Sequence, residues 1–357
     1  MTRTVLNLER ALWWGPGLAL VLVLVLAPLL FTDFYLSQVL TKALWLGIAA
    51  ASLIFLAGYV GMVSLGQVAL YGIAGFTMGN LVQADGGSTV AWNPWLGTLV
   101  GILVAAGFGL FFGAIASRSY GIYFLMLTLA LAVLTYYFFG QVTQLSGFGG
   151  VNNVDRPDIV SNPVTDPANL FYIALAASAA VYVLVRYLGR TPFGLALQGV
   201  RDDPLRMRAL GYNVPLLRMV AFGLGALIAG LAGILSVWWN TRISPGSIAL
   251  GQTIDVLIIA VIGGLYRLEG AWVGAIVFAV LDNWTRGLEL VGERFNTVIG
   301  AIFLAIVLVS PGGLMGIWGS ATGVLARSLG GRPPAQEPGP VPLTEEPHPT
   351  GETPQVP

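Results

Sequence analysis

The feature that most constrains the fold is a succession of long apolar segments separated by short polar ones. Each is about 20 residues long, and as an α-helix such a segment crosses the hydrocarbon core of a bilayer. The clearest segments are residues 11–31, 40–58, 96–116, 121–139, 170–188 and 217–239. Hydrophobic residues make up 56% of the chain and charged residues 10%, with a mean hydropathy of +0.80. The sequence therefore predicts an all-α integral membrane protein.

Shorter or interrupted apolar segments bring the expected number of transmembrane helices to about ten. Residues 58–82 are apolar but rich in glycine, residues 256–282 contain two runs separated at 263–270, and a last run spans 295–309. Glycine and small polar residues are tolerated at membrane depth where protein or a cavity covers the backbone. We therefore expect some of these helices to be short or broken.

The residue inventory excludes several classes of function. Cysteine is absent and the only histidine is His348, so the chain cannot build a disulfide framework, a zinc or haem site, or a cysteine nucleophile. The only lysine, Lys42, lies in no G-x-x-x-x-G-K-[ST] motif, so a nucleotide-binding P-loop is excluded. A net charge of zero gives no case for nucleic acid as a partner. We expect no metal, no cofactor and no enzymatic activity in this chain.

A polar loop at residues 189–216 separates two of the long apolar segments. Six arginines lie in or beside it: Arg186, Arg190, Arg201, Arg206, Arg208 and Arg218. Arginine-rich short loops remain on the cytoplasmic side of a membrane. We therefore expect this loop to face the cytoplasm.

The loop also contains the signals of a short surface helix. Asp202 and Asp203 stand where N-cap carboxylates accept backbone N–H groups, Pro204 suits the first helical position, and Gly211 suits a left-handed C-cap. Apolar residues among arginines suit docking into a cleft of a soluble partner, although a basic loop with a helical turn also occurs without any docking role. The residues expected to couple to a partner are Arg201, Asp202, Asp203, Pro204, Leu205, Arg206, Arg208, Ala209, Leu210 and Gly211.

The loop and the segment after it resemble a known family. The stretch TPFGLALQGVRDDPLRMRALGYN, followed by FGLGALIAGLAGIL, is similar to the coupling-loop region of LivM-type permease subunits of branched-chain amino acid ABC importers. The resemblance covers about residues 40–314. It implies a type II-like importer permease that forms the path for branched-chain or related small amino acids. The implied partners are a LivH-type permease, two ATP-binding subunits that hydrolyse ATP, and an extracytoplasmic substrate-binding protein.

Three further motifs resemble the family and carry candidates for the translocation path. They are GYVGMVSLGQVALYGIAGF, GIYFLMLTLALAV and the glycine-rich TQLSGFGGVNNV. The candidates are Ser64, Gly66 and Gln67 in the first, Thr128 in the second, and Ser146 and Gly147 in the third. Backbone amides of a glycine-rich turn are able to meet a carboxylate. Hydrogen bonding between helices remains an equal alternative for the first motif, and for Thr128 bonding within its own helix is the favoured alternative.

Asp255 is the remaining path candidate, just inside an apolar run that follows the family-like element ISPGS. A carboxylate at membrane depth is costly, so we expect it either to pair with Arg242 or to face a wet cavity. The later carboxylates Asp282, Glu289 and Glu293 are expected only to solvate an outer loop.

The distribution of basic residues predicts the topology. The expected cytoplasmic loops hold 12 of the 17 basic residues, and Lys42 is among the five expected outside. Residues 1–10 are then a cytoplasmic N-terminus, 11–315 the permease domain with an external loop at 140–169, and 316–357 a Pro/Gly-rich, largely disordered cytoplasmic tail. The resemblance implies a multi-pass protein of the bacterial cytoplasmic (inner) membrane, in contact with lipid.

Two other classes of membrane protein remain open at this point. A stand-alone secondary transporter or channel for a small polar solute is expected to carry coupling carboxylates at mid-membrane and inverted repeats. Asp255 is the one such carboxylate, and no repeat is evident. A scaffold that transports nothing fits poorly with so many glycine-interrupted helices.

Overall fold

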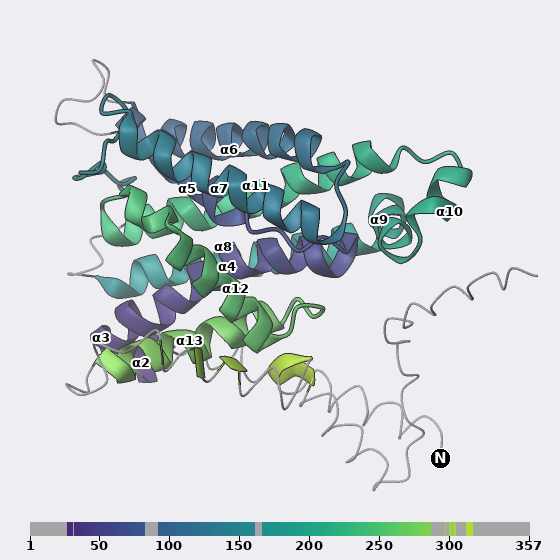
Figure 1. Ribbon diagram of the computed structural model, residues 1–357. Helices are drawn as coiled ribbons and strands as arrows, with labels where there is room; N and C mark the ends of the chain where they lie inside the picture. Colours follow the sequence, from purple (N-terminus) through teal and green to yellow (C-terminus); the bar gives the residue numbers. More distant parts are fainter. Residues whose placement is uncertain are drawn as a thin grey trace, which may run out of the picture.

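The computed structural model describes residues 27–30, 32–82, 92–160 and 166–286, with isolated positions between 297 and 316. Within these ranges the chain is mostly helical, and the β-type pairing is a single antiparallel bridge between Val151 and Ile243. Five helices are long and apolar enough to cross a membrane: Asp33–Val60, α6 (Pro94–Ala116), α7 (Gly121–Gln141), α8 (Pro167–Arg190) and α11 (Val214–Asn240). Figure 1 shows them running in roughly the same direction as one bundle. The all-α membrane class is thereby confirmed.

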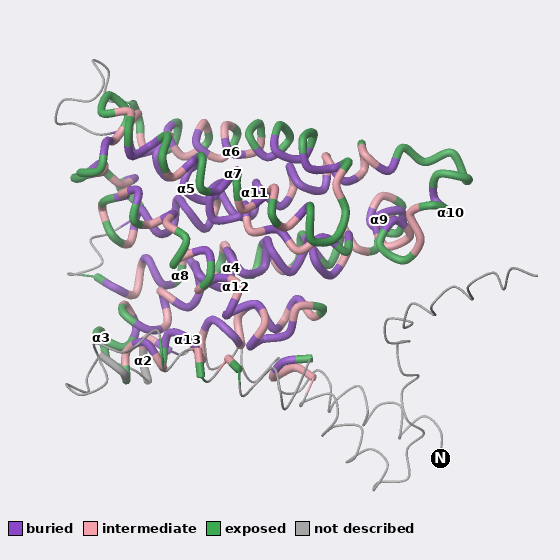
Figure 2. Tube along the Cα trace, viewed as in Figure 1, coloured by how far each residue is buried: buried purple, intermediate pink, exposed green. Residues whose placement is uncertain are grey.

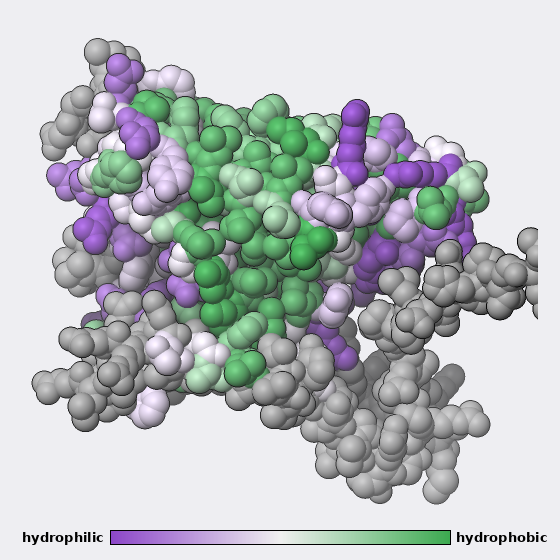
Figure 3. Space-filling model, in the orientation of Figure 1, coloured by the Kyte–Doolittle hydropathy of each residue, from purple (hydrophilic) through white to green (hydrophobic). Residues whose placement is uncertain are grey.

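Burial separates central helices from peripheral ones. In its most apolar window, Asp33–Val60 is 94% buried and α11 is 78% buried, whereas α6, α7 and α8 are each 33% buried. Figure 2 shows the same contrast along the chain trace. The peripheral helices expose large apolar side chains such as Leu99, Phe111 and Tyr123. These side chains suit contact with lipid or with another membrane subunit, and Figure 3 shows a hydrophobic belt between two more hydrophilic ends.

Small residues allow α11 to approach its neighbours closely. A Cβ on Gly233 would collide with the backbone carbonyl of Tyr71, and a Cβ on Gly109 of α6 would collide with Ala226. Without competition from water, close backbone approach of this kind is a main source of helix association in membranes. The glycine-rich sequence of α11 therefore specifies its central position.

The first long helix changes its winding at both ends. A π-helical segment, η1 (Leu36–Thr41), precedes α4 (Lys42–Phe55), and a second, η2 (Leu56–Val60), follows it. Gly61 then takes a left-handed conformation, with φ of 74°, and ends the helix. Residues 61–66 are mostly irregular before α5 (Gln67–Val82) begins. The glycine-rich segment expected at 58–82 is thus a broken helix, as predicted.

The second half of the chain contains shorter elements. The polar loop at residues 189–216, called the docking loop below for the role expected of it, forms α9 (Pro192–Asp202) and α10 (Pro204–Ala209). Helix α11 is followed by a 3-10 turn, η3 (Pro245–Ile248). The apolar run at 256–282 divides, as expected, into α12 (Leu250–Gly263) and α13 (Gly270–Arg286). The predicted last span and the C-terminal tail lie largely outside the described residues. The first span does too, apart from α2 (Ala27–Leu30).

Candidate functional site

The predicted surface helix is present as α10. Asp203 Oδ1 accepts hydrogen bonds from the backbone N–H groups of Leu205 and Arg206, both at 3.0 Å, so it is the N-cap residue. Gly211 has a positive φ of 89°, as expected of a glycine after the helix end. Asp202 does not cap this helix: it is the last residue of α9, and its carboxylate pairs with Arg201.

Helix α9 was not anticipated from the sequence. Its N-cap is Thr191, whose hydroxyl accepts from Gly194 N–H at 3.2 Å, and Pro192 occupies the first helical position. Met207 of α10 is buried in a small apolar cluster with Val200 of α9 and Val214 of α11. The docking loop is therefore a packed helical hairpin.

One face of α10 is free of contacts with the bundle. Leu205 is 74% exposed and Leu210 is 67% exposed, with the exposed Arg206 between them. Figure 1 shows α9 and α10 projecting from one end of the bundle. Exposed leucines with an arginine form a surface suited to an apolar and acidic cleft.

Several arginines in or beside this loop contact the membrane domain, and two of them, Arg201 and Arg208, also remain exposed. Arg201 Nη1 donates to the carbonyl of Gly58, at the end of the first long helix, at 2.6 Å. Arg208 donates to the hydroxyl of Tyr120, and Arg218 is buried inside α11 with its guanidinium 4.2 Å from the centre of the same ring. Figure 3 shows the hydrophilic side chains that remain at this end. These three arginines therefore connect the loop to the membrane domain.

A further arginine of this region forms an ion pair within the chain. Arg186 of α8 pairs with Glu269, in the turn between α12 and α13, and Tyr182 donates to the same carboxylate at 3.0 Å. The turn at 263–270 is thus tied to α8.

Four of the path candidates come together at the break before α5. Ser64 accepts from Gly66 N–H, and Thr128 of α7 accepts from Leu65 N–H, both at 3.2 Å. Thr128 also donates to Leu125 within its own helix at 3.0 Å, so its expected helix contact and its contact with the break are both present. Gln67 is only 2% exposed and its amide has no hydrogen-bond partner among the described residues.

The other two loop candidates do not join this group. Ser146 and Gly147 lie in a turn at the opposite end of α7, and their N–H groups donate to the carbonyl of Val142. Gly150 N–H donates to the carbonyl of Gly147. These amides are used inside the turn, and a contact between them and a substrate carboxylate stays a prediction.

Asp255 lies in a polar cavity of about 180 Å³. Its lining residues come from α4, α5, α11, η3, α12 and α13, close to the end of the bundle where α11 stops. Within the described residues Asp255 forms no hydrogen bond or ion pair, and the charges that act on it are those of Asp282 and Lys42. Of the two environments expected for Asp255, the cavity is present and the pairing with Arg242 is not.

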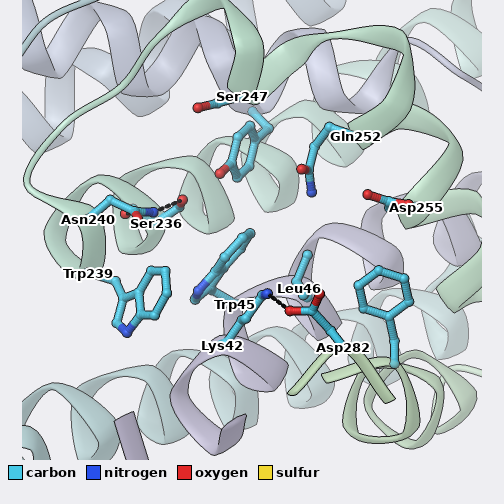
Figure 4. A pocket seen from close by; sticks show the side chains of 12 residues that line it. Lys42, Trp45, Leu46, Ser236, Trp239, Asn240, Ser247, Gln252, Asp255 and Asp282 are labelled. Carbon is cyan, nitrogen blue, oxygen red and sulfur yellow. Dashed lines mark hydrogen bonds and ion pairs between the residues drawn. The ribbon is translucent and has the colours of Figure 1, made fainter. Parts of the chain in front are cut away.

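The cavity also corrects the expected places of Lys42 and Asp282. Lys42 Nζ donates to Asp282 Oδ2 at 2.5 Å, and the two side chains are 18% and 7% exposed. Figure 4 shows this ion pair at the edge of the opening, with Asp255 across from it. Asp282 therefore does not solvate an outer loop; it pairs with Lys42 in a largely buried charged site, and the expected outer position of Lys42 stays a prediction. Glu289 and Glu293 lie outside the described residues.

Sequence reasoning missed the aromatic walls of this cavity. Trp45, Tyr71, Trp239 and Phe278 all line it, with Ser236, Ser247 and Gln252 as neutral polar neighbours. The signal that was available is the only lysine of the chain, placed inside an apolar segment, because an intramembrane charge requires a partner.

Comparisons with known proteins agree with this architecture. The profile of the family described as "Branched-chain amino acid transport system / permease component" matches residues 35–307. The permease protein LivM of the high-affinity branched-chain amino acid transport system of Salmonella typhimurium is 24% identical over 282 residues, which cover 72% of this chain and 64% of that relative. A probable LivM of Methanocaldococcus jannaschii is 23% identical, over 62% of this chain and 66% of the relative.

The second permease type of these systems is also similar. LivH of Salmonella typhimurium is 26% identical over 152 residues, 43% of this chain and 48% of the relative. No solved structure matches. The family profile covers more than half of the chain, and the chain therefore belongs to the family of permease components of branched-chain amino acid transport systems.

Proposed function

We propose that this chain is the LivM-type membrane subunit of an ATP-driven importer and forms part of the translocation path for branched-chain or related small amino acids. The proposal is supported by the family and by the names of the relatives, which are transport-system permeases. The single observation that supports it most is the exposed surface of α10 and its C-cap residue. Leu205, Arg206 and Leu210 are all exposed there.

The complete assembly follows from the same proposal. The subunit has about ten transmembrane helices, a type II-like arrangement and both termini in the cytoplasm of a bacterial cell. It pairs with a LivH-type permease, receives substrate from an extracytoplasmic binding protein, and contacts two ATP-binding subunits through α10. ATP hydrolysis takes place on those partners, and this chain catalyses no reaction.

The mechanism needs two conformations and a partner that binds one of them better. Closure of the ATP-binding subunits displaces the α9–α10 hairpin, and Arg201 connects α9 to Gly58 at the end of the first long helix. The break at residues 61–66 comes directly after this helix end in the chain. When the hairpin moves, the break therefore moves with it, together with Ser64 and, at the start of α5, Gln67.

The docking role is tested with a double variant, Arg206→Glu with Leu210→Asp. Both side chains are exposed, so the protein is expected to insert and fold normally. Reversing a charge and burying a carboxylate in the interface should abolish co-purification with the ATP-binding subunits and reduce substrate-stimulated ATP hydrolysis at least about tenfold, equivalent to about 1.4 kcal/mol.

A matched control makes the same chemical changes at the opposite end of the bundle. Arg242→Glu with Ile159→Asp alters another exposed arginine and an apolar residue that is 62% exposed. This control is expected to retain co-purification with the ATP-binding subunits. Normal stimulation of the Arg206/Leu210 variant would exclude the docking role of α10.

A further inference from the structure

Among the residues that the structure describes, the cavity around Asp255 is lined by more negative than positive groups. Its described lining holds one cation, Lys42, and two carboxylates, Asp255 and Asp282. Lys42 and Asp282 pair with each other, which leaves Asp255 without a partner among the described residues. An unpaired carboxylate at membrane depth is costly unless a cationic group or water reaches it. The cavity is therefore prepared for a positive group.

The walls and size of the cavity indicate what carries that positive group. Trp45, Trp239 and Phe278 present aromatic surface, and Trp45 is 95% buried while its indole Nε1 has no hydrogen-bond partner in the described part of the chain. The volume of about 180 Å³ exceeds the roughly 150 Å³ that accommodates benzene in an apolar cavity. A solute with a small apolar body fits this space and can cover more of the aromatic surface than a bare cation does.

Lys42 supplies the complementary charge. An ammonium group has three N–H donors, and Asp282 accepts one of them. The remaining donors are available to a carboxylate that enters the cavity beside the pair. In Figure 4, Lys42 and Asp255 lie on different sides of the opening, so opposite charges of one small molecule can be met together.

Gln67 extends the polar surface inward. Tyr71 lines the cavity, and Gln67 lies one helical turn deeper on the same face of α5. The amide of Gln67 is buried and has no partner within the described ranges, and it faces Gly225 of α11, where a Cβ would lie 3.4 Å from its oxygen. The cavity and this unsatisfied amide are successive polar positions along one helix face.

We propose that the cavity is a receiving site for an amino-acid zwitterion with an apolar side chain. Asp255 accepts the α-ammonium group of the substrate, and Lys42 donates to its carboxylate. The aromatic walls cover the side chain, and Gln67 is the next polar contact on the way inward. This inference rests on the proposed import of amino acids and names the site in this subunit that recognises them.

The absence of cysteine from the sequence allows a direct binding test. Ser247→Cys places a single thiol in the lining of the cavity with almost no change in volume. The rate at which a cationic methanethiosulfonate labels this thiol is measured in the full transporter in membranes, with and without small molecules. The probes are L-leucine, isoamylamine, which lacks the carboxylate, and 4-methylpentanoate, which lacks the ammonium group.

L-leucine is expected to slow labelling at least about tenfold at saturation, isoamylamine to protect partially, and 4-methylpentanoate not to protect. Adding Asp255→Asn should weaken protection by leucine about tenfold, or about 1.4 kcal/mol. Asp158→Asn, the same change at an exposed carboxylate outside the cavity, should leave it unchanged. The elution profile of each variant checks that it is folded, and protection is expressed relative to that variant's own unprotected labelling rate.

Three results would overturn the site: no protection by leucine, equal protection by 4-methylpentanoate, or protection by sodium ions alone, which would assign Asp255 to ion coupling. Labelling does not depend on ATP hydrolysis. The experiment therefore distinguishes a failure of the proposed cavity site from a failure of the proposed importer assignment. Unprotected labelling with normal leucine-stimulated hydrolysis would refute only the cavity site. Full protection in a protein that recovers no ATP-binding subunit would refute only the importer assignment.

Discussion

Replacing Lys42 with methionine tests how much of the fold depends on the charged cavity. The change keeps most of the side-chain volume but removes the ammonium group that Asp282, which is 7% exposed at its side chain, contacts at 2.5 Å. Removing one partner of a buried ion pair costs about 3–5 kcal/mol, and because the Lys42 side chain is 18% exposed we reduce this to about 2–4 kcal/mol. Asp255 raises the cost, since two carboxylates then share one cavity.

The assay is thermal unfolding of the purified protein in mild detergent, followed by tryptophan fluorescence. Lys42→Met should lower the midpoint by several degrees, and adding Asp282→Asn should restore most of the loss because both charges are then removed. Arg206→Met is the control: it breaks a pair whose side chains are 79% and 45% exposed and should cost no more than about 1 kcal/mol. The reasoning is refuted if Lys42→Met is as mild as this control, or if the double variant is no more stable than Lys42→Met.

Two further predictions concern helix contacts. Gly233→Leu should prevent α11 from packing on α5, because even a Cβ would collide with the carbonyl of Tyr71, and it should abolish monodisperse elution; Gly107→Leu, at a position with open space around the Cβ, should not. Asp203→Ala should destabilise α10 by about 0.5–2 kcal/mol and speed hydrogen exchange of its first amides, whereas Asp202→Ala should not; equal exchange in the two variants would contradict the assignment of the cap.

The spans were predictable because their lengths and apolar content are local properties of the chain. The expected helix at 121–139 corresponds to α7, and that at 217–239 to α11. The caps of α10 were equally local, since Asp203, Pro204 and Gly211 act within a few residues of one another. Charge counting also found the docking loop, because its arginines lie close together in sequence.

The cavity was not predictable because its parts are distant in sequence. Lys42 and Asp282 are 240 positions apart, and nothing local distinguishes a buried carboxylate near a helix end from one in an outer loop. Arg218 shows the same limit, since its apparent membership of the docking loop depends on which side of α11 faces the bundle. Helix rotation is set by packing of the other helices, which a single sequence does not reveal.

The contact between Arg201 and Gly58 restricts how this protein can move. The guanidinium donates a hydrogen bond to the carbonyl of Gly58. The methylene groups of the same side chain pack against Gly61, where an added Cβ would lie only 2.8 Å from Arg201 Cγ. Movement of α9 away from the first long helix therefore stretches the hydrogen bond from Arg201 to Gly58. Movement toward it presses the Arg201 side chain against the backbone of Gly61. A displacement of α9 in either direction therefore acts directly on the end of the first long helix at Gly58 and Gly61.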